Sequence, residues 1–552
     1  MKKVCNSFFA GKFVDDQSGQ VLAWVVVMMM CFMGAAGLVI DGGAAYADHA
    51  ALQQSANAAA LAAAGQAYDT GSSSGAVTIG DTFSATQGDD NSGANFLGTK
   101  VTTTVTPTCL NALLPAGATC AQQTSGFVNA VHVLQSNSYK PTFMCFFGMC
   151  SMTINAEATA TMNGQAEQWN VAIIVDGTGS MSTTDSNCGT TSGTFTEFQC
   201  ALAGVQQLLG GNGGLNPCPG AGTGCKTTAG QLGTPVFRVS LFTFPNVAYP
   251  TFDQNTMSTC GATLTHEPYT FPGASATPGT GNITPTAGYT EVGSPKATYQ
   301  ITPFDYTYYS TSATTGNLNP SDNLVQAIGY GASPNTNKIG TAGCLPNVGG
   351  EGTYYAGVLY AAQEALLAEK ASYPNSKNAI IMLSDGDATS DAAQMDSATK
   401  TAGATVSTSQ TYPYPSTFDE CQQAIQAAQI AYNQGTEVIT IAYGAETSGC
   451  GVSGTDTTVL SSPSLPNTVN TAYTLSSFLP CISMQNISSP ASNGTLANFY
   501  SDPNQSASSG LDKTCGSSGS NNVNSAISNL QSIFSAIEAG FTSPKLISNS
   551  TT

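Results

Sequence analysis

The longest uninterrupted apolar segment of the sequence runs from Val21 to Ile40 and contains no charged residue. As a helix, these 20 residues would be roughly 30 Å long, which matches the thickness of a bilayer core. Lysines precede the segment and aspartates follow it. The positive-inside rule therefore predicts a cytoplasmic N-terminus over 1–20, a single transmembrane helix over 21–40, and the remaining chain beyond the membrane.

The alanine-rich sequence after this segment predicts that the helix continues. Residues 41–69 contain no proline, and Leu52, Ala56, Ala59 and Ala63 fall on one helical face. Small side chains on one face allow close packing against a sheet or a partner helix. We therefore expect a stalk helix over 41–69.

Residues 70–165 show a different periodicity. Lys100 to Thr106 and Ser151 to Ala160 alternate in polarity and are rich in threonine, which is typical of strands. This pattern predicts a small β-rich region without visible chemistry over 70–165. We interpret its histidine, His132, as structural or exposed.

Short apolar runs and amphipathic segments alternate over residues 166–545. The expected strands are 170–176, 237–244, 379–385, 436–443 and 498–500, and the expected helices are 195–209, 354–367, 418–433 and 523–539. Such alternation predicts a doubly wound α/β domain with a mostly parallel sheet. Long Gly-, Ser-, Thr-, Pro- and Asn-rich loops separate these elements, at 210–235, 245–349, 388–416 and 444–495. The tyrosines and prolines of 268–312 suit either an adhesive surface or a β excursion.

Composition narrows the function classes. Charged residues make up 9% of the 552 residues, and the formal net charge is −19. A chain without a basic patch is not expected to bind nucleic acid.

Fourteen of the 16 cysteines follow the apolar segment, and such scattered cysteines predict disulfides in an oxidising compartment. The alternative is a set of reduced thiols in the core.

Candidate chemistry begins where the first α/β strand ends. Asp176, Thr178 and Ser180 place a carboxylate and two hydroxyls on alternate residues of one loop. Hard divalent cations such as Mg²⁺, Mn²⁺ or Ca²⁺ prefer oxygen ligands of this kind. Two neutral hydroxyls leave part of the cation's charge uncompensated, so the cation could also accept an acidic group from a partner.

Two further residues are expected to converge on this loop. Thr353 precedes the helix 354–367, where it could instead be only a helix N-cap. Asp385 ends the strand 379–385, where it could instead be only a turn residue. The carboxyl ends of parallel strands are where open α/β sheets bind ligands. A separate calcium loop is a weaker alternative, with EF-hand-like spacing at Asp385, Asp387, Thr389, Asp391 and Asp396.

Two resemblances follow from these residues. The segment Asp16 to Gln20, the apolar run, Asp41-Gly and the segment Leu52 to Leu61 resemble the TadE/TadG-like pilus-assembly family of the bacterial tight-adherence (Tad, Flp pilus) machinery. The loop and its two companions resemble the metal-ion-dependent adhesion site (MIDAS) of von Willebrand factor type A (VWA) domains, with Thr178 where that family has serine. TadG-type proteins join such an anchor to such a domain, and the resemblance implies that the β-rich region 70–165 is pilin-like.

The resemblances imply a function. They imply a pilus-assembly or adhesion protein of the bacterial inner membrane, with a single pass and a periplasmic or extracellular C-terminal domain. The metal site would bind an envelope or pilus protein, with Asp176, Thr178, Ser180, Thr353 and Asp385 as its metal residues. The alternatives are a structural, minor-pilin-like protein with an idle metal site, or a metal-assisted hydrolase.

The sequence favours a binding module over an enzyme. It contains no HExxH motif, no phosphate loop and no nucleophile elbow. A hydrolase at Asp176 and Asp385 would need a general base, and none is apparent.

The N-terminus has three possible fates. Signal peptidase could cut after Ala47, a prepilin-type peptidase could cut after Gly19, or the chain could remain uncut. An apolar run of 20 residues exceeds the usual 7–15 residues, approximately, of a cleavable segment. Trp24 also stands where prepilin-like substrates usually carry glutamate. We therefore expect the anchor to be retained.

Overall fold

The chain divides into two compact units in the computed structural model, and each is described on its own. The helix–sheet unit contains Met1–Ala112, Gly126–Asn163 and Pro544–Thr552, and the α/β unit contains Leu113–Ser125 and Gly164–Ser543. The structure describes residues 20–70, 73–95, 100–113, 119–122, 128–161, 168–185, 195–210, 214–218, 235–249, 296–310, 317–329, 345, 353–385, 388, 420–443, 458–459, 473–474, 480–489, 498–502 and 530–549.

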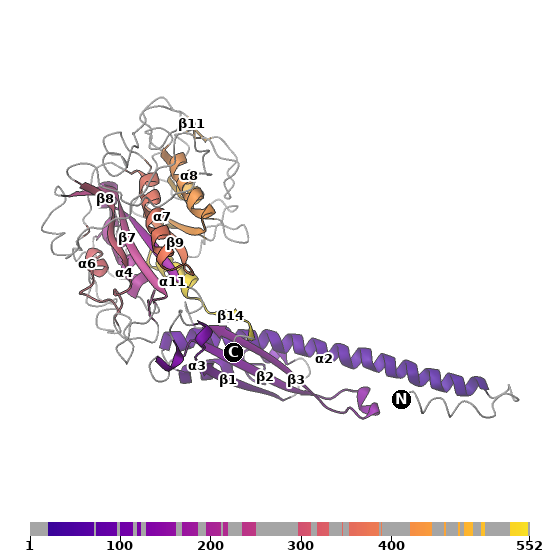
Figure 1. The fold of residues 1–552 in the computed structure, drawn as a ribbon. Helices are drawn as coiled ribbons and strands as arrows, with labels where there is room; N and C mark the ends of the chain where they lie inside the picture. Colours follow the sequence, from indigo (N-terminus) through magenta and orange to yellow (C-terminus); the bar gives the residue numbers. More distant parts are fainter. Residues whose placement is uncertain are drawn as a thin grey trace. The chain divides into compact units, whose positions relative to one another are not determined.

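One continuous helix of 51 residues, α2 (Gln20–Thr70), dominates the helix–sheet unit (Figure 1). It joins the predicted membrane segment and the predicted stalk without a break. Among the described residues, α2 is the helix that is long and apolar enough to cross a bilayer, a property that a signal sequence near an N-terminus would share. Its first half exposes its large apolar side chains, whereas Leu52, Ala56, Ala59 and Ala63 are fully buried, as the sequence predicts.

An antiparallel sheet of four strands covers the buried face of α2. Its order is β1 (Val101–Thr108), β2 (Ala130–Tyr139), β3 (Met152–Thr161) and β14 (Lys545–Ile547). The strands expected near residues 100 and 151 are therefore present. A short helix, α3 (Ser73–Thr82), packs on α2 and β1 in a region that the sequence predicted to be β-rich. Short 3₁₀ helices occur in both units: η1 (Ser92–Ala94), η2 (Asn111–Leu113), η3 (Cys120–Gln122), η4 (Met144–Phe147) and η5 (Ser180–Ser182).

Polar contacts fix the register between α2 and β2. Tyr139 Oη donates to Asp41 Oδ1 at 3.2 Å, and Asn137 Nδ2 donates to Asp48 Oδ2 at 2.8 Å. The two aspartates are seven residues apart, which is two helical turns, so they share the buried face of α2. Sliding the helix along the sheet would leave buried carboxyl groups without these donors, which is costly.

A mostly parallel sheet of six strands forms the centre of the α/β unit. Its order is β13 (Phe499–Asp502), β10 (Thr436–Tyr443), β9 (Lys377–Ser384), β4 (Trp169–Asp176), β7 (Phe237–Tyr249) and β8 (Lys296–Asp305). β8 alone runs antiparallel to its neighbour, and the other pairs are parallel. Numbered along the chain, the strand order is 3-2-1-4-5-6, the doubly wound arrangement. The predicted mixed α/β class with a mostly parallel sheet is therefore confirmed.

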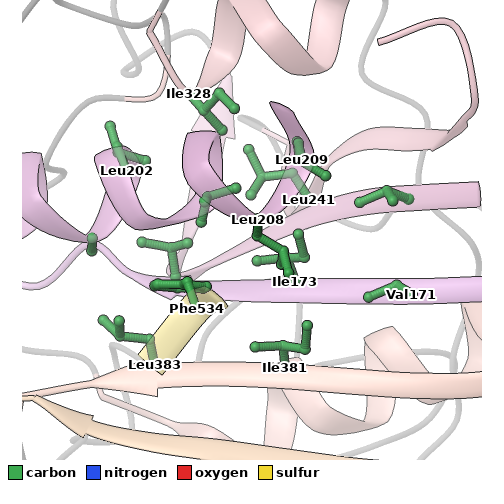
Figure 2. Close-up of a cluster of buried hydrophobic side chains, with 14 of the residues drawn as sticks. Val171, Ile173, Leu202, Leu208, Leu209, Leu241, Ile328, Ile381, Leu383 and Phe534 are labelled. Atoms are coloured by element: carbon green, nitrogen blue, oxygen red, sulfur yellow. The ribbon is translucent and has the colours of Figure 1, made fainter. Parts of the chain in front are cut away.

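Helices cover both faces of this sheet. One face carries α7 (Tyr355–Ser372), α8 (Glu420–Asn433) and α9 (Pro480–Ile487). The other carries α4 (Glu197–Gly210), α6 (Asn323–Ala327) and α11 (Leu530–Thr542). Successive residues of β4 alternate between the two cores, with Ile173 on the α4 side and Ile174 on the α7 side, which explains its unbroken apolar sequence. Figure 2 shows Ile173, Leu208 and Phe534 meeting in the first of these cores.

Parts of the predicted loops are in fact regular elements. β8 and α6 lie within 245–349, and α9 lies within 444–495. β8 corresponds to the β excursion that was one of two possibilities for 268–312. The unit also contains two-stranded pairs, β5 (Thr184–Asp185) with β6 (Phe195–Thr196) and β11 (Thr458–Val459) with β12 (Tyr473–Thr474).

Disulfides occur in the described part of the chain. Cys145 and Cys150 are joined, and Cys109, Cys120, Cys200, Cys218 and Cys421 are also disulfide-bonded. Among the described cysteines, Cys31 in the apolar half of α2 is free and exposed. The prediction that cysteines beyond the apolar segment form disulfides is confirmed for the disulfide-bonded residues named above.

Candidate metal centre

The candidate site lies where two central parallel strands end. Asp176 is the last residue of β4, and Asp385 follows the last residue of β9. These strands are direct neighbours, with Val175 paired to Leu383. In chain order they are the first and fourth strands of the six-stranded sheet. The strand order of a doubly wound sheet reverses between these two strands. Ligands bind in open α/β sheets at this switch point, outside the carboxyl ends of the strands.

Hydrogen bonds link four of the five predicted residues into one chain. Asp176 Oδ1 accepts from the Thr178 amide at 2.8 Å and from Thr178 Oγ1 at 2.6 Å. Thr178 Oγ1 lies 2.9 Å from Ser180 Oγ. Ser180 Oγ donates to Asp385 Oδ1 at 2.9 Å. Carboxyl and hydroxyl oxygens from two separate strand ends therefore meet in one cluster.

Thr353, the fifth predicted residue, is buried two positions before α7 begins. Within the described part of the chain, it does not belong to the hydrogen-bond chain above. The first residue of α7 does reach the cluster: Tyr355 Oη lies 2.7 Å from Ser384 Oγ, and Ser384 Oγ donates to Asp176 Oδ2. The helix that Thr353 precedes is therefore tied to the site.

Burial dominates the electrostatics of the cluster. Burial, followed by the negative charges of Asp176 and Glu197, raises the pKa of Asp385 to about 9. Burial also raises the pKa of Asp176, although hydrogen bonds from Ser384 and Thr178 oppose the rise. Two buried carboxyl groups this close together cannot both ionise without a large cost in free energy unless a positive charge lies nearby. A bound cation would supply that charge.

The donor chemistry fits a hard divalent cation. The four linked side chains offer only oxygen atoms, in two carboxyl and two hydroxyl groups, and Mg²⁺, Mn²⁺ and Ca²⁺ prefer such ligands. In the described ranges, no three His, Cys, Asp or Glu side chains are placed to hold a metal ion together. A cation here would therefore need the hydroxyls of Thr178 and Ser180 as well as the carboxylates.

Three residues at the site were not predicted from the sequence. Ser384 bonds with Asp176, Tyr355 bonds with Ser384, and the Glu197 carboxyl bonds with Asp385. Ser384 had a usable signal, since it ends a buried strand directly before Asp385. Glu197 had a weaker signal, as an acidic residue in the first turn of α4. Of the alternative calcium loop, only Asp385 lies within the described residues.

Two kinds of similarity to known proteins are found. Residues 19–66 match the family model described as "Putative Flp pilus-assembly TadE/G-like". Among solved structures, two crystal structures of the pilus adhesin SpaC from Lactobacillus rhamnosus GG match, one of them in an open conformation. Their TM-scores are 0.32 and 0.29 and their sequence identities 12% and 13%, over 80% of this chain.

The match covers 35% and 34% of the two SpaC chains, so this chain spans about a third of SpaC. The search of curated proteins found no match. The family match coincides with α2, from the residue before its start to near its end. The N-terminal helix of this chain is thus similar to the TadE/G-like segment of Flp pilus-assembly proteins.

Proposed function

We propose that this protein is a membrane-anchored pilus-assembly or adhesion protein whose α/β unit binds a partner through a divalent cation. One observation carries the proposal: Asp176, Thr178, Ser180 and Asp385 form a single hydrogen-bonded cluster across two neighbouring strand ends. In this proposal these four residues hold the cation, and Thr353 joins them from the start of α7. When bound, the cation's charge would attract a carboxylate of the partner.

The proposed identity of the α/β unit is a VWA domain with a MIDAS loop. Two independent features support it. The sheet has the 3-2-1-4-5-6 order with one antiparallel edge strand, and the Asp-x-Thr-x-Ser loop lies at the switch point of that sheet. The middle threonine keeps the hydroxyl of the serine that it replaces, and this hydroxyl bonds to both Asp176 and Ser180.

The proposed partner is an envelope or pilus protein, and the proposed location is the bacterial inner membrane. The TadE/G-like segment supports the pilus connection, and its exposed apolar half supports a single membrane pass. In this arrangement residues 1–20 lie in the cytoplasm and the α/β unit lies in the periplasm or outside the cell.

Binding is preferred here over catalysis. Each cluster residue is engaged in hydrogen bonds that shape an oxygen-lined cation site, and a hydrolase would also need a positioned general base. Turnover of an ester or phosphate by the purified protein would revive the hydrolase alternative. A structural minor pilin with an idle metal site remains the second alternative, and it predicts that removal of the cation changes no interaction.

Calorimetry on the detergent-solubilised full-length protein tests the metal site. The wild type should bind one Mg²⁺ or Mn²⁺ ion, and Asp176→Ala should bind none. Thr178→Ser should retain binding because it keeps the hydroxyl, whereas the nearly isosteric Thr178→Val should lose it. Equal affinity in the wild type and Asp176→Ala would rule out this site.

A further inference from the structure

The connection between β2 and β3 is unusually apolar. The segment Phe143–Met152, here called the tip loop, contains three phenylalanines and three methionines among its ten residues. No charged residue occurs between Lys140 and Glu157. Exposed hairpin connections are normally polar, so this composition requires an explanation.

Among the described side chains of the tip loop, three large apolar ones are exposed. Phe143 is 41% exposed, Met149 is 50% exposed and Met152 is 36% exposed. The disulfide between Cys145 and Cys150 closes a short ring that contains Met149, and Phe143 and Met152 flank this ring. Leaving such surface in water forgoes about 25 cal/mol for each Å² that could be buried.

The tip loop is fixed to α2 beside the end of its apolar half. The Asp41 carboxylate accepts hydrogen bonds from the backbone amides of Thr142, Phe143 and Met144, at 3.0, 2.8 and 2.6 Å. A Cβ atom added at Gly37 would lie 2.5 Å from Phe143 Cβ, so glycine is what allows this close approach. Figure 1 shows the end of the β2–β3 hairpin alongside α2.

This attachment sets the depth of the loop relative to the apolar segment. Gly37 precedes Ile40, the last residue of that segment, by three residues, or about 4.5 Å along a helix. Phe143 therefore lies level with the last turn of the segment. Groups that bind at a membrane interface typically bury their apolar side chains about 5–10 Å into the headgroup and acyl boundary.

We propose that the tip loop inserts into the non-cytoplasmic surface of the same bilayer that α2 crosses, as a second membrane contact. The inference rests on the proposed membrane anchoring of α2. The occupant of the exposed apolar surface is lipid, because the loop continues the apolar surface of α2 and lies at the interface depth. Lys140, exposed at the base of the loop, would face anionic headgroups. Two contacts would restrain the tilt of the helix–sheet unit on the membrane.

Tryptophan fluorescence in lipid vesicles tests the inference on the full-length chain. The two native tryptophans are Trp24 in α2 and Trp169 in β4. In a Trp24→Phe background, Met149→Trp or Met152→Trp reports on the tip loop. Leu546→Trp is the matched control, because Leu546 is 44% exposed in the same unit. It pairs with Ala160 of β3, about 26 Å along that strand from Met152.

The vesicles contain phosphatidylcholine and phosphatidylglycerol, with bromine atoms placed on the acyl chains near the headgroups. Tryptophan at either tip position should show blue-shifted emission and at least about twofold more quenching than at position 546, as expected for interfacial depth. Quenching equal to the control would overturn the inference. A blue shift without bromine quenching would also overturn it, since the loop would then be covered by protein.

A separate measurement distinguishes failure of the anchor from failure of the tip loop. In the chain that retains Trp24, the same bromines near the headgroups should quench Trp24 if α2 spans the bilayer, because Trp24 lies three residues inside the apolar segment, about 4.5 Å from its cytoplasmic end. If Trp24 is quenched but the tip positions are not, the anchor stands and the tip-loop inference is wrong. If Trp24 is not quenched either, the proposed membrane anchoring itself fails.

Discussion

Buried carboxyl groups recur in the α/β unit, and their surroundings decide whether each of them carries a charge. At the candidate metal centre, burial and neighbouring acids raise the pKa of Asp385 to about 9. A second pair lies at the start of α6, where burial and the neighbouring Asp305 raise the pKa of Asp322 to about 7. The first pair would gain from the proposed cation, whereas the second has a structural role that can be tested through pH.

The second pair predicts a pH dependence of stability. Asp322 caps α6 by accepting from the amides of Leu324 and Val325. The folded protein keeps the Asp322 proton up to about pH 7, whereas an unfolded aspartate loses it near its usual pKa of 3.8. The folded state then binds more protons, so stability should fall as pH rises from about 4 to about 7 and level off above that.

Asp322→Asn should remove most of that fall, because asparagine also caps helices but does not ionise. The expected difference between variant and wild type is on the order of 2–4 kcal/mol between pH 4.5 and pH 8. Urea unfolding across this range provides the measurement. Asp305→Asn serves as a matched variant and should also flatten the profile. Parallel profiles for all three proteins would show that the aspartate pair does not control this dependence.

Helix packing against the central sheet depends on one close contact between α4 and α11. Gly204 in α4 faces the Phe534 ring in α11, and a Cβ atom there would overlap that ring. Phe534 is only 1% exposed, so it has little room to move. Gly204→Ala should therefore destabilise the unit by about 1–2 kcal/mol, since overpacking outweighs the gain in helix propensity.

Gly540→Ala provides the control within α11. Gly540 is exposed, and an added Cβ would meet nothing within 4 Å. That substitution should stabilise the protein by roughly 0.5–1 kcal/mol. Thermal unfolding of both variants beside the wild type measures the two effects. Equal destabilisation by both substitutions would contradict the assigned contact.

The elements that were predicted correctly carry their own signal in the sequence. β4, β9 and β10 are buried on both faces, so their apolar runs are continuous, and α2 shows its buried face through alanine spacing. β8 is an edge strand whose pairing with β7 is interrupted by register shifts. Its position therefore depends on the tertiary structure rather than on its own sequence pattern. β14 has three residues, too few to show a period.

The candidate site follows the same rule. Asp176 and Asp385 could be predicted because each follows a buried strand, and the order of those strands brings them together. The contact between Glu197 and Asp385 could not be predicted, because it depends on how the loop after β4 leads into α4. No pattern of apolar and polar residues in the sequence indicates the course of this loop.

For the whole chain, the α/β unit is largely an insertion in the helix–sheet unit. The chain leaves the helix–sheet unit after β3 and returns to it as β14. These two strands are neighbours, with Thr161 paired to Lys545. Both main connections of the α/β unit therefore start from adjacent points of one sheet.

The hydrogen bonds of Asp41 also favour an uncut N-terminus. Cleavage after Ala47 would remove Asp41, which holds the tip loop and Tyr139 through hydrogen bonds. Cleavage after Gly19 would leave α2 whole, since the helix begins at Gln20. Intact mass of the membrane-extracted protein should show an uncut chain. A first residue of Gln20 would indicate a pilin-like subunit, and a first residue of Asp48 would indicate a released protein.

The central claim is that the α/β unit binds a partner through a cation held by the Asp176 cluster. The most direct test captures proteins from an envelope extract on the full-length chain, immobilised in nanodiscs, and quantifies them by mass spectrometry. The account predicts proteins that are retained with Mg²⁺ by the wild type and Thr178→Ser, and lost with EDTA or with Thr178→Val. Retention of the same proteins by Thr178→Val or in EDTA would contradict it.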